Sequence, residues 1–290
     1  MEKIYMRARA KINLYLDVLS KREDSYHELS TIMQSLAIYD GIYIKKIYKP
    51  NYLKLVSNLS WLPCDERNLV HQAASYMIKR FDVKEGIFIE LKKMIPASAG
   101  LGGGSADCAA TLVGIRNLFN LPIKDSELVE IGARFGADVP FCLMRGCCLA
   151  TGIGEKLQRL PSMPHAYVLL VRPPVAVSTP EVFRDFSIDN KSRPTDLDEL
   201  IKSIGDKNLK GVTNNLYNAL EENVCKKYPI ISAVKAKLIK HGAAGALMSG
   251  SGPTVFGIFE RRNAGFAAMH SIKSAYPEFS EVFLTTFYNV

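Results

Sequence analysis

The stretch that decides the fold reads Pro96-Ala97-Ser98-Ala99-Gly100-Leu101-Gly102-Gly103-Gly104-Ser105-Ala106-Asp107. Four of the five residues from 100 to 104 are glycine, and such a run favours neither helix nor strand, because glycine loses the most backbone entropy on ordering. The alanine-rich segment 106–116 that follows is predicted to be a helix. Exposed N–H groups at a helix N-terminus, with the positive end of the helix dipole, form a phosphate cradle. The sequence therefore predicts a protein that handles a polyphosphate.

Spacing excludes the commoner phosphate-binding loops. A P-loop needs Gly-Lys followed by Ser or Thr, and the chain contains no Gly-Lys pair. A dinucleotide-binding fingerprint aligned on Gly100 and Gly102 needs glycine at position 105, where the chain has serine. The His-Arg-Asp and Asp-Phe-Gly motifs of protein kinases are both missing. The alternative of a flexible surface linker is disfavoured, because the glycines lead directly into an apolar helix.

The glycine-rich segment resembles the ATP loop of the GHMP kinases, which include galactokinase and the homoserine, mevalonate and phosphomevalonate kinases. Segments 8–16 (ARAKINLYL) and 248–256 (MSGSGPTVF) match the other two motifs of that family in order and separation, over nearly the whole chain. Segments 21–29 (KREDSYHEL) and 136–141 (GADVPF) narrow the resemblance to members that act on a cytidine-diphosphate-linked sugar alcohol. The resemblance implies an α+β fold of two lobes, with the active site in the cleft between them.

Composition is consistent with a two-lobed enzyme. A chain of 290 residues that is 48% hydrophobic can bury a full core. The net charge of +8 suits anionic substrates such as ATP, and without a long basic run or a nucleic-acid motif we expect no nucleic-acid partner. We also expect no membrane association, because no apolar run reaches the ~18 residues of a span. The six cysteines contain no Cys-x-x-Cys pair and no export signal precedes them, so reduced thiols and a cytoplasmic location are predicted.

Hydrophobic periodicity predicts the elements of each lobe. We place the ATP-binding and catalytic lobe at 1–160 and an α+β lobe at 161–290. Strands are expected at 4–17, 31–36, 41–47, 52–56, 87–91, 166–171, 244–248, 254–259 and 281–287, and helices at 68–81, 106–116, 125–135, 195–204, 212–226, 229–241 and 263–275.

Asp138 and Lys11 are the predicted catalytic residues. Asp138 follows a predicted helix on the short link 136–140, between apolar neighbours, which suits a partly buried carboxylate that accepts a proton from a hydroxyl. The alternative is an aspartate with only a turn-forming role. Lys11 interrupts an apolar run, and from the pattern alone it could face solvent. The resemblance pairs Lys11 with Asp138, where a cation favours the ionised carboxylate and attracts the transferred phosphoryl group.

The nucleotide-binding residues follow from the glycine-rich segment. Ser105 is expected to offer its hydroxyl to a phosphate or to Mg²⁺, which is itself expected because the β- and γ-phosphates need neutralising. Asp107 is either a metal ligand or a residue that favours the helix dipole, and we do not count it as a site residue; the metal ligands are not identified. The resemblance places Lys93 and Asn68 on the adenine side, although Asn68 alternatively begins a helix. The predicted ATP-binding residues are Pro96, Ala97, Ser98, Ala99, Gly100, Leu101, Gly102, Gly103, Gly104, Ser105, Ala106, Asn68 and Lys93.

Tyr26 and His27 are the predicted base-recognition residues, because cytosine needs hydrogen-bond partners and a flat stacking surface. The alternative is a pair at a strand edge. The resemblance adds Thr179 and Phe183 as a second wall, with Phe183 opposite Tyr26, and Asn13 beside the acceptor hydroxyl. The turn 250–252 needs no function as a hairpin, and the resemblance implies that it packs against the first glycine loop.

Together these features predict an ATP-dependent kinase with a small-molecule substrate. The resemblance implies that this substrate is a cytidine diphosphate sugar alcohol and that the reaction belongs to the non-mevalonate route to isoprenoid precursors. Three alternatives stay open at this point: a related kinase acting on homoserine or a mevalonate, an RNA-binding protein that shares the fold of the first lobe, and a nucleotide-binding regulator without catalysis. The sequence leaves the oligomeric state open.

Overall fold

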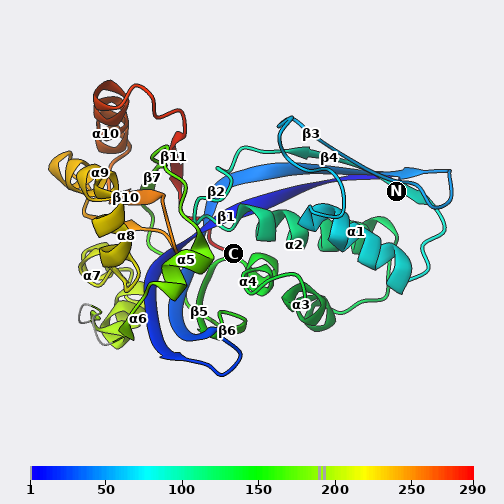
Figure 1. Cartoon of the computed structure of the whole chain (residues 1–290), viewed down its shortest axis with the longest axis horizontal. Helices are drawn as coiled ribbons and strands as arrows, with labels where there is room; N and C mark the ends of the chain where they lie inside the picture. Colours follow the sequence, from blue (N-terminus) through cyan, green and yellow to red (C-terminus); the bar gives the residue numbers. More distant parts are fainter. Residues whose placement is uncertain (1, 189–190, 192–193) are drawn as a thin grey trace. The chain divides into compact units, whose positions relative to one another are not determined.

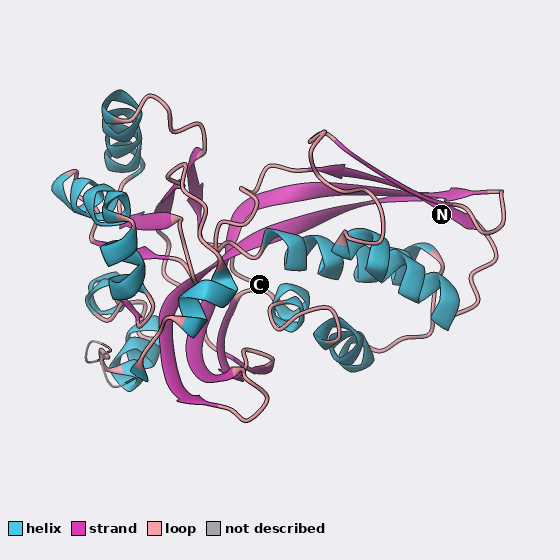
Figure 2. Ribbon diagram, in the orientation of Figure 1, coloured by secondary structure: helices cyan, strands magenta, loops and turns pink. Residues whose placement is uncertain are grey.

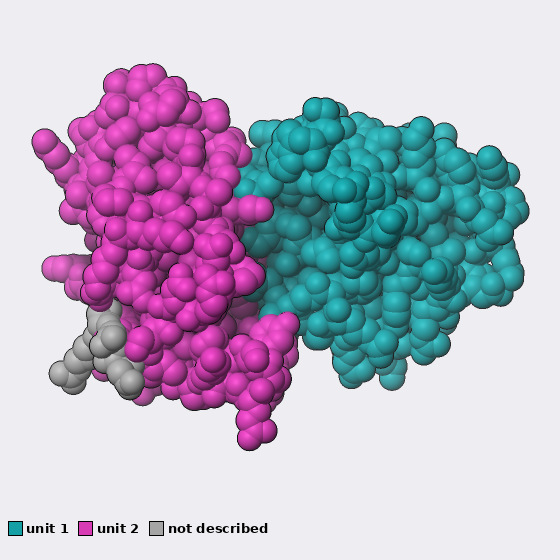
Figure 3. Space-filling view, viewed as in Figure 1, with its two compact units in different colours: residues 1–10, 38–97, 102–144 teal, residues 11–37, 98–101, 145–290 magenta. Residues whose placement is uncertain are grey.

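The computed structural model describes residues 2–188, 191 and 194–290 (Figure 1). The chain forms two compact units, distinguished by colour in Figure 3. Unit 1 comprises residues 1–10, 38–97 and 102–144, and unit 2 comprises residues 11–37, 98–101 and 145–290. The boundary expected near residue 160 lies inside unit 2, so the assignment of ATP binding and catalysis to 1–160 stays a prediction.

Two long strands, β1 (Lys3–Lys21) and β2 (His27–Ile47), contribute residues to both units. In unit 1 the strand order is β3-β4-β2-β1, with β3 (Leu53–Ser57) parallel and β2 antiparallel to β4 (Gly86–Lys92). Alternate residues such as Ile42 and Ile44 are buried, as expected for a sheet with one covered face. The expected strands at 31–36 and 41–47 are a single continuous strand.

Helices cover one face of this sheet in unit 1 (Figure 2). They are α1 (Leu69–Arg80), α2 (Gly103–Leu118), α3 (Asp125–Ala133) and α4 (Val139–Met144). Gly114 lets α2 approach the sheet, because a Cβ atom there would lie 2.6 Å from Ile44 Cδ1. The helix expected after the glycines is confirmed and begins three residues earlier, at Gly103. Helix α4 was not predicted.

Unit 2 contains a second sheet with the antiparallel order β11-β7-β10-β9. Its strands are β7 (Tyr167–Val171), β9 (Gly245–Met248), β10 (Val255–Phe259) and β11 (Val282–Thr286), all of which were predicted. Helices α9 (Pro229–Lys240) and α10 (Arg262–Ala275) pack against it. The apolar face of α9 buries Ile231, Val234 and Leu238, at helical spacing.

The rest of unit 2 departs further from the sequence prediction. Strand β5 (Cys147–Gly152) pairs antiparallel with β2, and β6 (Lys156–Arg159) pairs antiparallel with β5. Neither strand was predicted, nor was α5 (Thr179–Arg184). Helix α6 (Leu197–Gly205) matches its prediction. The single helix expected over 212–226 is wrong. The structure has α7 (Leu209–Asn214), the two-residue strand β8 (Tyr217–Asn218) and α8 (Glu221–Lys227), because β8 pairs in parallel with β1.

Across the described part of the chain, no helix combines the length and the apolar character that a bilayer span requires.

Candidate functional site

The glycine-rich loop turns through left-handed backbone at three alternate residues before α2 begins. Ser98, Gly100 and Gly102 have φ angles of 50°, 73° and 65°. Gly102 is the N-cap of α2, and no side chain caps the helix there. The first N–H groups of an α-helix have no intrahelical acceptor, so those at the start of α2 can bind an anion. The local backbone therefore has the properties expected of a phosphate cradle.

A second glycine turn, residues 249–252, contacts Gly100 within unit 2. Ser249 Oγ donates a hydrogen bond of 2.8 Å to the Gly100 carbonyl oxygen. A Cβ atom on Gly100 would lie 2.1 Å from the carbonyl oxygen of Ser249, so only glycine fits without a backbone shift. The expectation that the second turn packs against the first glycine loop is confirmed.

Lys11 and Asn13 lie at the centre of a buried polar chain on β1. Lys11 Nζ donates to Asn13 Oδ1 over 2.7 Å, and Asn13 Nδ2 donates to Thr31 Oγ1 over 2.8 Å. The Lys11 backbone N–H also donates to the carbonyl oxygen of Leu101, over 3.0 Å. Lys11 is only 5% exposed, so the alternative of a solvent-facing lysine is wrong. The network orients the ammonium group, because Asn13 is itself fixed by Thr31.

Asp138 is half-buried and directly precedes α4 in unit 1. Its backbone carbonyl accepts a hydrogen bond from the N–H of Cys142, over 3.1 Å, so the residue occupies the N-cap position of this short helix. Lys11 belongs to unit 2, and the pairing of Lys11 with Asp138 stays a prediction.

Lys93, Asp40 and Asp107 form a buried ion cluster in unit 1. Lys93 Nζ donates to Asp40 and, over 2.7 Å, to Asp107 Oδ2. The other oxygen of Asp40 accepts from the backbone N–H groups of Met94 and Ile95. Burial alone would lower the pKa of Lys93, but the carboxylates of Asp107 and Asp40 outweigh it and raise that pKa. Asp40, which sequence reasoning missed, was signalled only by a lone carboxylate inside the apolar strand segment 36–44.

Asp107 retains a proton more readily than an ordinary aspartate. Burial raises its pKa well above the usual value, the Asp40 carboxylate adds to this, and the Lys93 ammonium offsets it only in part. Its Oδ1 atom is buried without a hydrogen-bond partner. The Lys93 ammonium therefore bonds to two carboxyl groups, those of Asp40 and Asp107. The prediction that Lys93 contacts adenine is not tested by this geometry.

Asn68 has a structural role of its own. Its side chain accepts from the backbone N–H of Val70 over 2.9 Å and donates to the carbonyl of Pro63 over 2.7 Å. This is the helix-starting role that the sequence left open as an alternative, and it is a typical N-cap arrangement. A contact between Asn68 and adenine stays a prediction.

The predicted base-recognition residues partly come together in unit 2. The rings of His27 and Phe183 stack with centroids 5.3 Å apart and an interplanar angle of 30°. Burial, with a smaller contribution from Lys21, lowers the pKa of His27 and so favours its neutral form. Thr179 Oγ1 lies 2.6 Å from Ser251 Oγ and links this wall to the second glycine turn. Tyr26 is 60% exposed, which leaves its ring accessible to a ligand.

Comparison with known proteins identifies the family. The profiles "GHMP kinases N terminal domain" and "GHMP kinases C terminal" match residues 68–146 and 196–278. A curated 4-diphosphocytidyl-2-C-methyl-D-erythritol kinase from Acetivibrio thermocellus is 43% identical over 275 residues, 95% of this chain and 96% of that protein. The chain belongs to the 4-diphosphocytidyl-2-C-methyl-D-erythritol kinase family. The predicted GHMP-kinase resemblance and enzyme class are therefore confirmed.

Other matches agree with this family. A 4-diphosphocytidyl-2-C-methyl-D-erythritol kinase from Lachnoclostridium phytofermentans is 41% identical and covers 99% of this chain and 98% of its own. A crystal structure of 4-(cytidine 5'-diphospho)-2C-methyl-D-erythritol kinase superposes with a TM-score of 0.83 at 28% identity, over 99% of this chain and 100% of that one. A homoserine kinase from Cytophaga hutchinsonii superposes at 0.77 with 19% identity over 99% of this chain and 95% of its own, which shows the fold alone. The predicted α+β, two-domain GHMP-kinase fold is confirmed.

Proposed function

We propose that this chain transfers the γ-phosphoryl group of ATP to the 2-hydroxyl of 4-diphosphocytidyl-2-C-methyl-D-erythritol, giving the 2-phosphate and ADP. One observation carries the proposal: an uncapped helix start after a left-handed glycine loop, in a chain 43% identical to a kinase named for this substrate. Phosphoryl transfer depends mainly on positioning and on charge stabilisation, which such a loop provides.

The glycine at position 104 supports a close approach by phosphate. A Cβ atom there would meet only Leu69 Cδ1, at 3.8 Å, so the packing of the protein does not require glycine. Glycine costs roughly 1 kcal/mol relative to alanine in a helix interior, and it stays a poor helix former at the second residue of α2. A residue that disfavours the helix and is not needed for packing is expected where a ligand contacts the backbone. We assign residues 96–106 to the triphosphate and keep Lys93 and Asn68 as proposed adenine-side residues.

Mg²⁺ is part of the proposal because it neutralises the β- and γ-phosphates when bound with ATP. Among the residues that the structure describes, no group of three or more His, Cys, Asp or Glu side chains can hold a metal ion. This fits a Mg²⁺ ion held chiefly by nucleotide and water, which needs only one or two protein oxygens. Ser105, in the first turn of α2, is the hydroxyl we propose for phosphate or Mg²⁺.

Asp138 and Lys11 are the proposed catalytic residues. Asp138 would accept or orient the proton of the acceptor hydroxyl, and Lys11 would stabilise the negative charge of the transferring group. The Asn13–Thr31 hydrogen bonds support the role of Lys11, because they hold its ammonium in one position before substrate arrives. Asn13 is the proposed neighbour of the acceptor hydroxyl.

Tyr26, His27, Thr179 and Phe183 are the proposed cytosine-binding residues. The exposed Tyr26 ring and the Phe183 ring offer flat surfaces, and a neutral imidazole offers one donor and one acceptor nitrogen. The six cysteines are free thiols, which supports the further proposal of a reducing, cytoplasmic location.

The direct test is a coupled ADP-release assay with 4-diphosphocytidyl-2-C-methyl-D-erythritol beside homoserine and mevalonate. We expect turnover with the cytidylyl substrate alone. Turnover with homoserine or mevalonate but not with the cytidylyl compound would contradict the proposal.

Two substitutions assign the roles in the same assay. Asp138→Ala should lower kcat by at least ~10²-fold while ATP binding is kept, the scale of a positioned acid–base group. His27→Ala should raise the KM of the cytidylyl substrate more than the KM of ATP. Near-normal turnover of the first variant, or an equal rise of both constants in the second, would remove that residue from its role.

A further inference from the structure

Two side chains outside the sequence motifs, those of Asn218 and Glu221, form hydrogen bonds with the backbone at the second glycine turn and at the residue before it. Asn218 Nδ2 donates to the carbonyl oxygens of Met248 and Gly250, each over 2.8 Å. Glu221 Oε1 accepts from the backbone N–H of Met248 over 2.8 Å. Both backbone groups of Met248, the last residue of β9, are thus bonded to side chains, one from β8 and one from the first residue of α8.

Each of these two side chains is itself fixed. Asn218 Oδ1 accepts from the Leu220 N–H over 3.0 Å, and Asn218 pairs with Leu16 of β1 in the parallel β8–β1 register. Glu221 Oε2 forms an ion pair with Lys235 of α9. Asn218 is 5% exposed. If its amide were removed, the carbonyl oxygens of Met248 and Gly250 would therefore lose a hydrogen bond that water could not easily replace.

A further hydrogen bond connects the residue after Met248 to the glycine-rich loop. Ser249 follows Met248 directly and donates its hydroxyl hydrogen to the Gly100 carbonyl, over 2.8 Å. In a planar trans peptide the carbonyl of Gly100 and the N–H of Leu101 point in opposite directions. Fixing that carbonyl on Ser249 therefore also fixes the direction of the Leu101 N–H, one of the donors assigned to phosphate.

We propose that Asn218 and Glu221 are positioning residues for ATP binding, which act through the second glycine turn on the Gly100–Leu101 peptide without touching the nucleotide. The inference rests on the proposed function, because it takes the glycine-rich loop as the triphosphate site. It concerns a group of residues, 218, 221 and 235, that lies outside all five sequence motifs.

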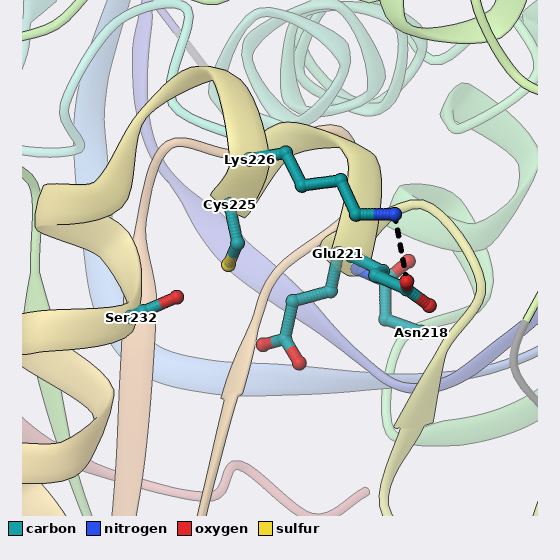
Figure 4. Close-up of a pocket in the computed structure, with 6 residues that line it drawn as sticks. Asn218, Glu221, Cys225, Lys226 and Ser232 are labelled. Atoms are coloured by element: carbon teal, nitrogen blue, oxygen red, sulfur yellow. Dashed lines mark ion pairs between the residues drawn. The ribbon is translucent and has the colours of Figure 1, made fainter.

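Asn218 and Glu221 lie at a cavity of about 400 Å³ (Figure 4), and another residue that lines it, Glu222, offers a matched control. Asn218 and Glu221 line it together with Glu222, Cys225, Lys226 and Ser232. Glu222 forms an exposed ion pair of 2.8 Å with Lys226, one helical turn away, rather than a bond to the glycine turn. Glu222→Ala therefore changes the same cavity without releasing Met248, and it should leave nucleotide binding unchanged.

The test is the dissociation constant of AMP-PNP, measured by calorimetry well below the melting temperature of each variant. Asn218→Ala and Glu221→Ala should each weaken binding by about fivefold to tenfold, the scale of one or two lost hydrogen bonds. Glu221→Gln has a single acceptor oxygen for both the Met248 N–H and the Lys235 ammonium, so its affinity should lie between those of Glu221→Ala and the wild type. Because Gln has the same shape as Glu, comparing Glu221→Gln with Glu221→Ala tests the positioning role even if Asn218→Ala fails to fold.

A double-mutant cycle with Ser249→Ala separates positioning from general stability. If Asn218 acts through Ser249, the double variant should bind AMP-PNP about as weakly as the weaker single variant. Fully additive losses, or unchanged binding in both alanine variants, would overturn the inference. Wild-type turnover of the cytidylyl substrate, recorded alongside, tests the proposed function separately: an inactive wild type refutes that function, whereas an active wild type with unaffected variants refutes the inference alone.

Discussion

The two units fix their glycine-rich segments by different means. In unit 1 the residues that lead into the glycine-rich loop are anchored by the buried ion cluster of Asp40, Lys93 and Asp107. In unit 2 the second glycine turn is anchored by an amide and a carboxylate that bond to backbone groups, beside an open cavity. The first anchor consists of buried charged side chains. The second consists mainly of hydrogen bonds to backbone groups, and its one ion pair, Glu221–Lys235, is partly exposed at Lys235.

The difference predicts different consequences of damage. Removing Asp40 leaves the buried Lys93 ammonium beside Asp107 alone, whose raised pKa makes it a poorer counter-charge, and this is strongly destabilising. Removing one hydrogen bond between side chain and backbone costs less, because no uncompensated charge stays buried. We therefore expect the first anchor to control the stability of the fold and the second to control the position of a ligand-binding peptide.

Asp40→Ala should produce the largest effect. The variant loses the acceptor of two backbone N–H groups and one partner of the buried Lys93, so the free energy of unfolding should fall by roughly 3–5 kcal/mol. Urea unfolding measures this directly. Lys84→Ala, which removes an exposed ion pair with Asp82 in the same unit, is the control and should be indistinguishable from the wild type. Equal urea midpoints for the wild type, Asp40→Ala and the control would show that the buried ion cluster does not control the stability of the fold.

Gly100→Ala should have an intermediate effect, seen in ligand binding. The new Cβ atom would clash with the Ser249 carbonyl, and the residue would keep an unfavourable φ of 73° that costs roughly 1–2 kcal/mol. We expect the AMP-PNP affinity to fall by more than ~10-fold, since 1.4 kcal/mol corresponds to a factor of ten. Gly205→Ala places a Cβ atom in open space in the same unit and serves as the control. Unchanged affinity in Gly100→Ala would show that the contact with Ser249 does not matter.

Asp107→Asn should have the smallest effect, and its sign should depend on pH. The folded-state pKa of Asp107 lies well above its usual value of 3.8, so the folded protein binds this proton more tightly than the unfolded chain. Wild-type stability therefore falls as pH rises above about 4 and until it passes the folded-state pKa. Asparagine cannot ionise, so the variant should gain stability relative to the wild type between pH 5 and pH 8. Unfolding curves at the two pH values test this, and a relative loss at pH 8 would contradict it.

Much of the fold could be predicted because its signals are local. The glycine run, the periodic helices and the strands of the second sheet each depend on residues within one segment. The Pro180 that follows Thr179 and the Pro140 in α4 are also local signals, since proline is favoured in the first turn of a helix. These two short helices were missed although the sequence indicated them.

The anchors could not be predicted because they depend on distant partners. Apolar residues such as Val212, Leu216 and Leu220 suit a helix through 212–226, and nothing nearby reveals that Tyr217 and Asn218 pair with β1. Asn218 becomes significant only through Met248 and Gly250, and Asp40 only through Lys93. For the candidate site, the sequence indicated which residues bind and react, whereas the residues that hold them in place appear only in three dimensions.

The continuity of β1 and β2 through both units has a consequence for how this enzyme can be dissected. A fragment cut after residue 160 would leave its C-terminal piece without the portions of β1, β2, β5 and β6 that complete unit 2. The units are interleaved along the chain, so neither is a single contiguous segment that one cut could separate. Chimeric kinases built from this chain must exchange three separate stretches at once.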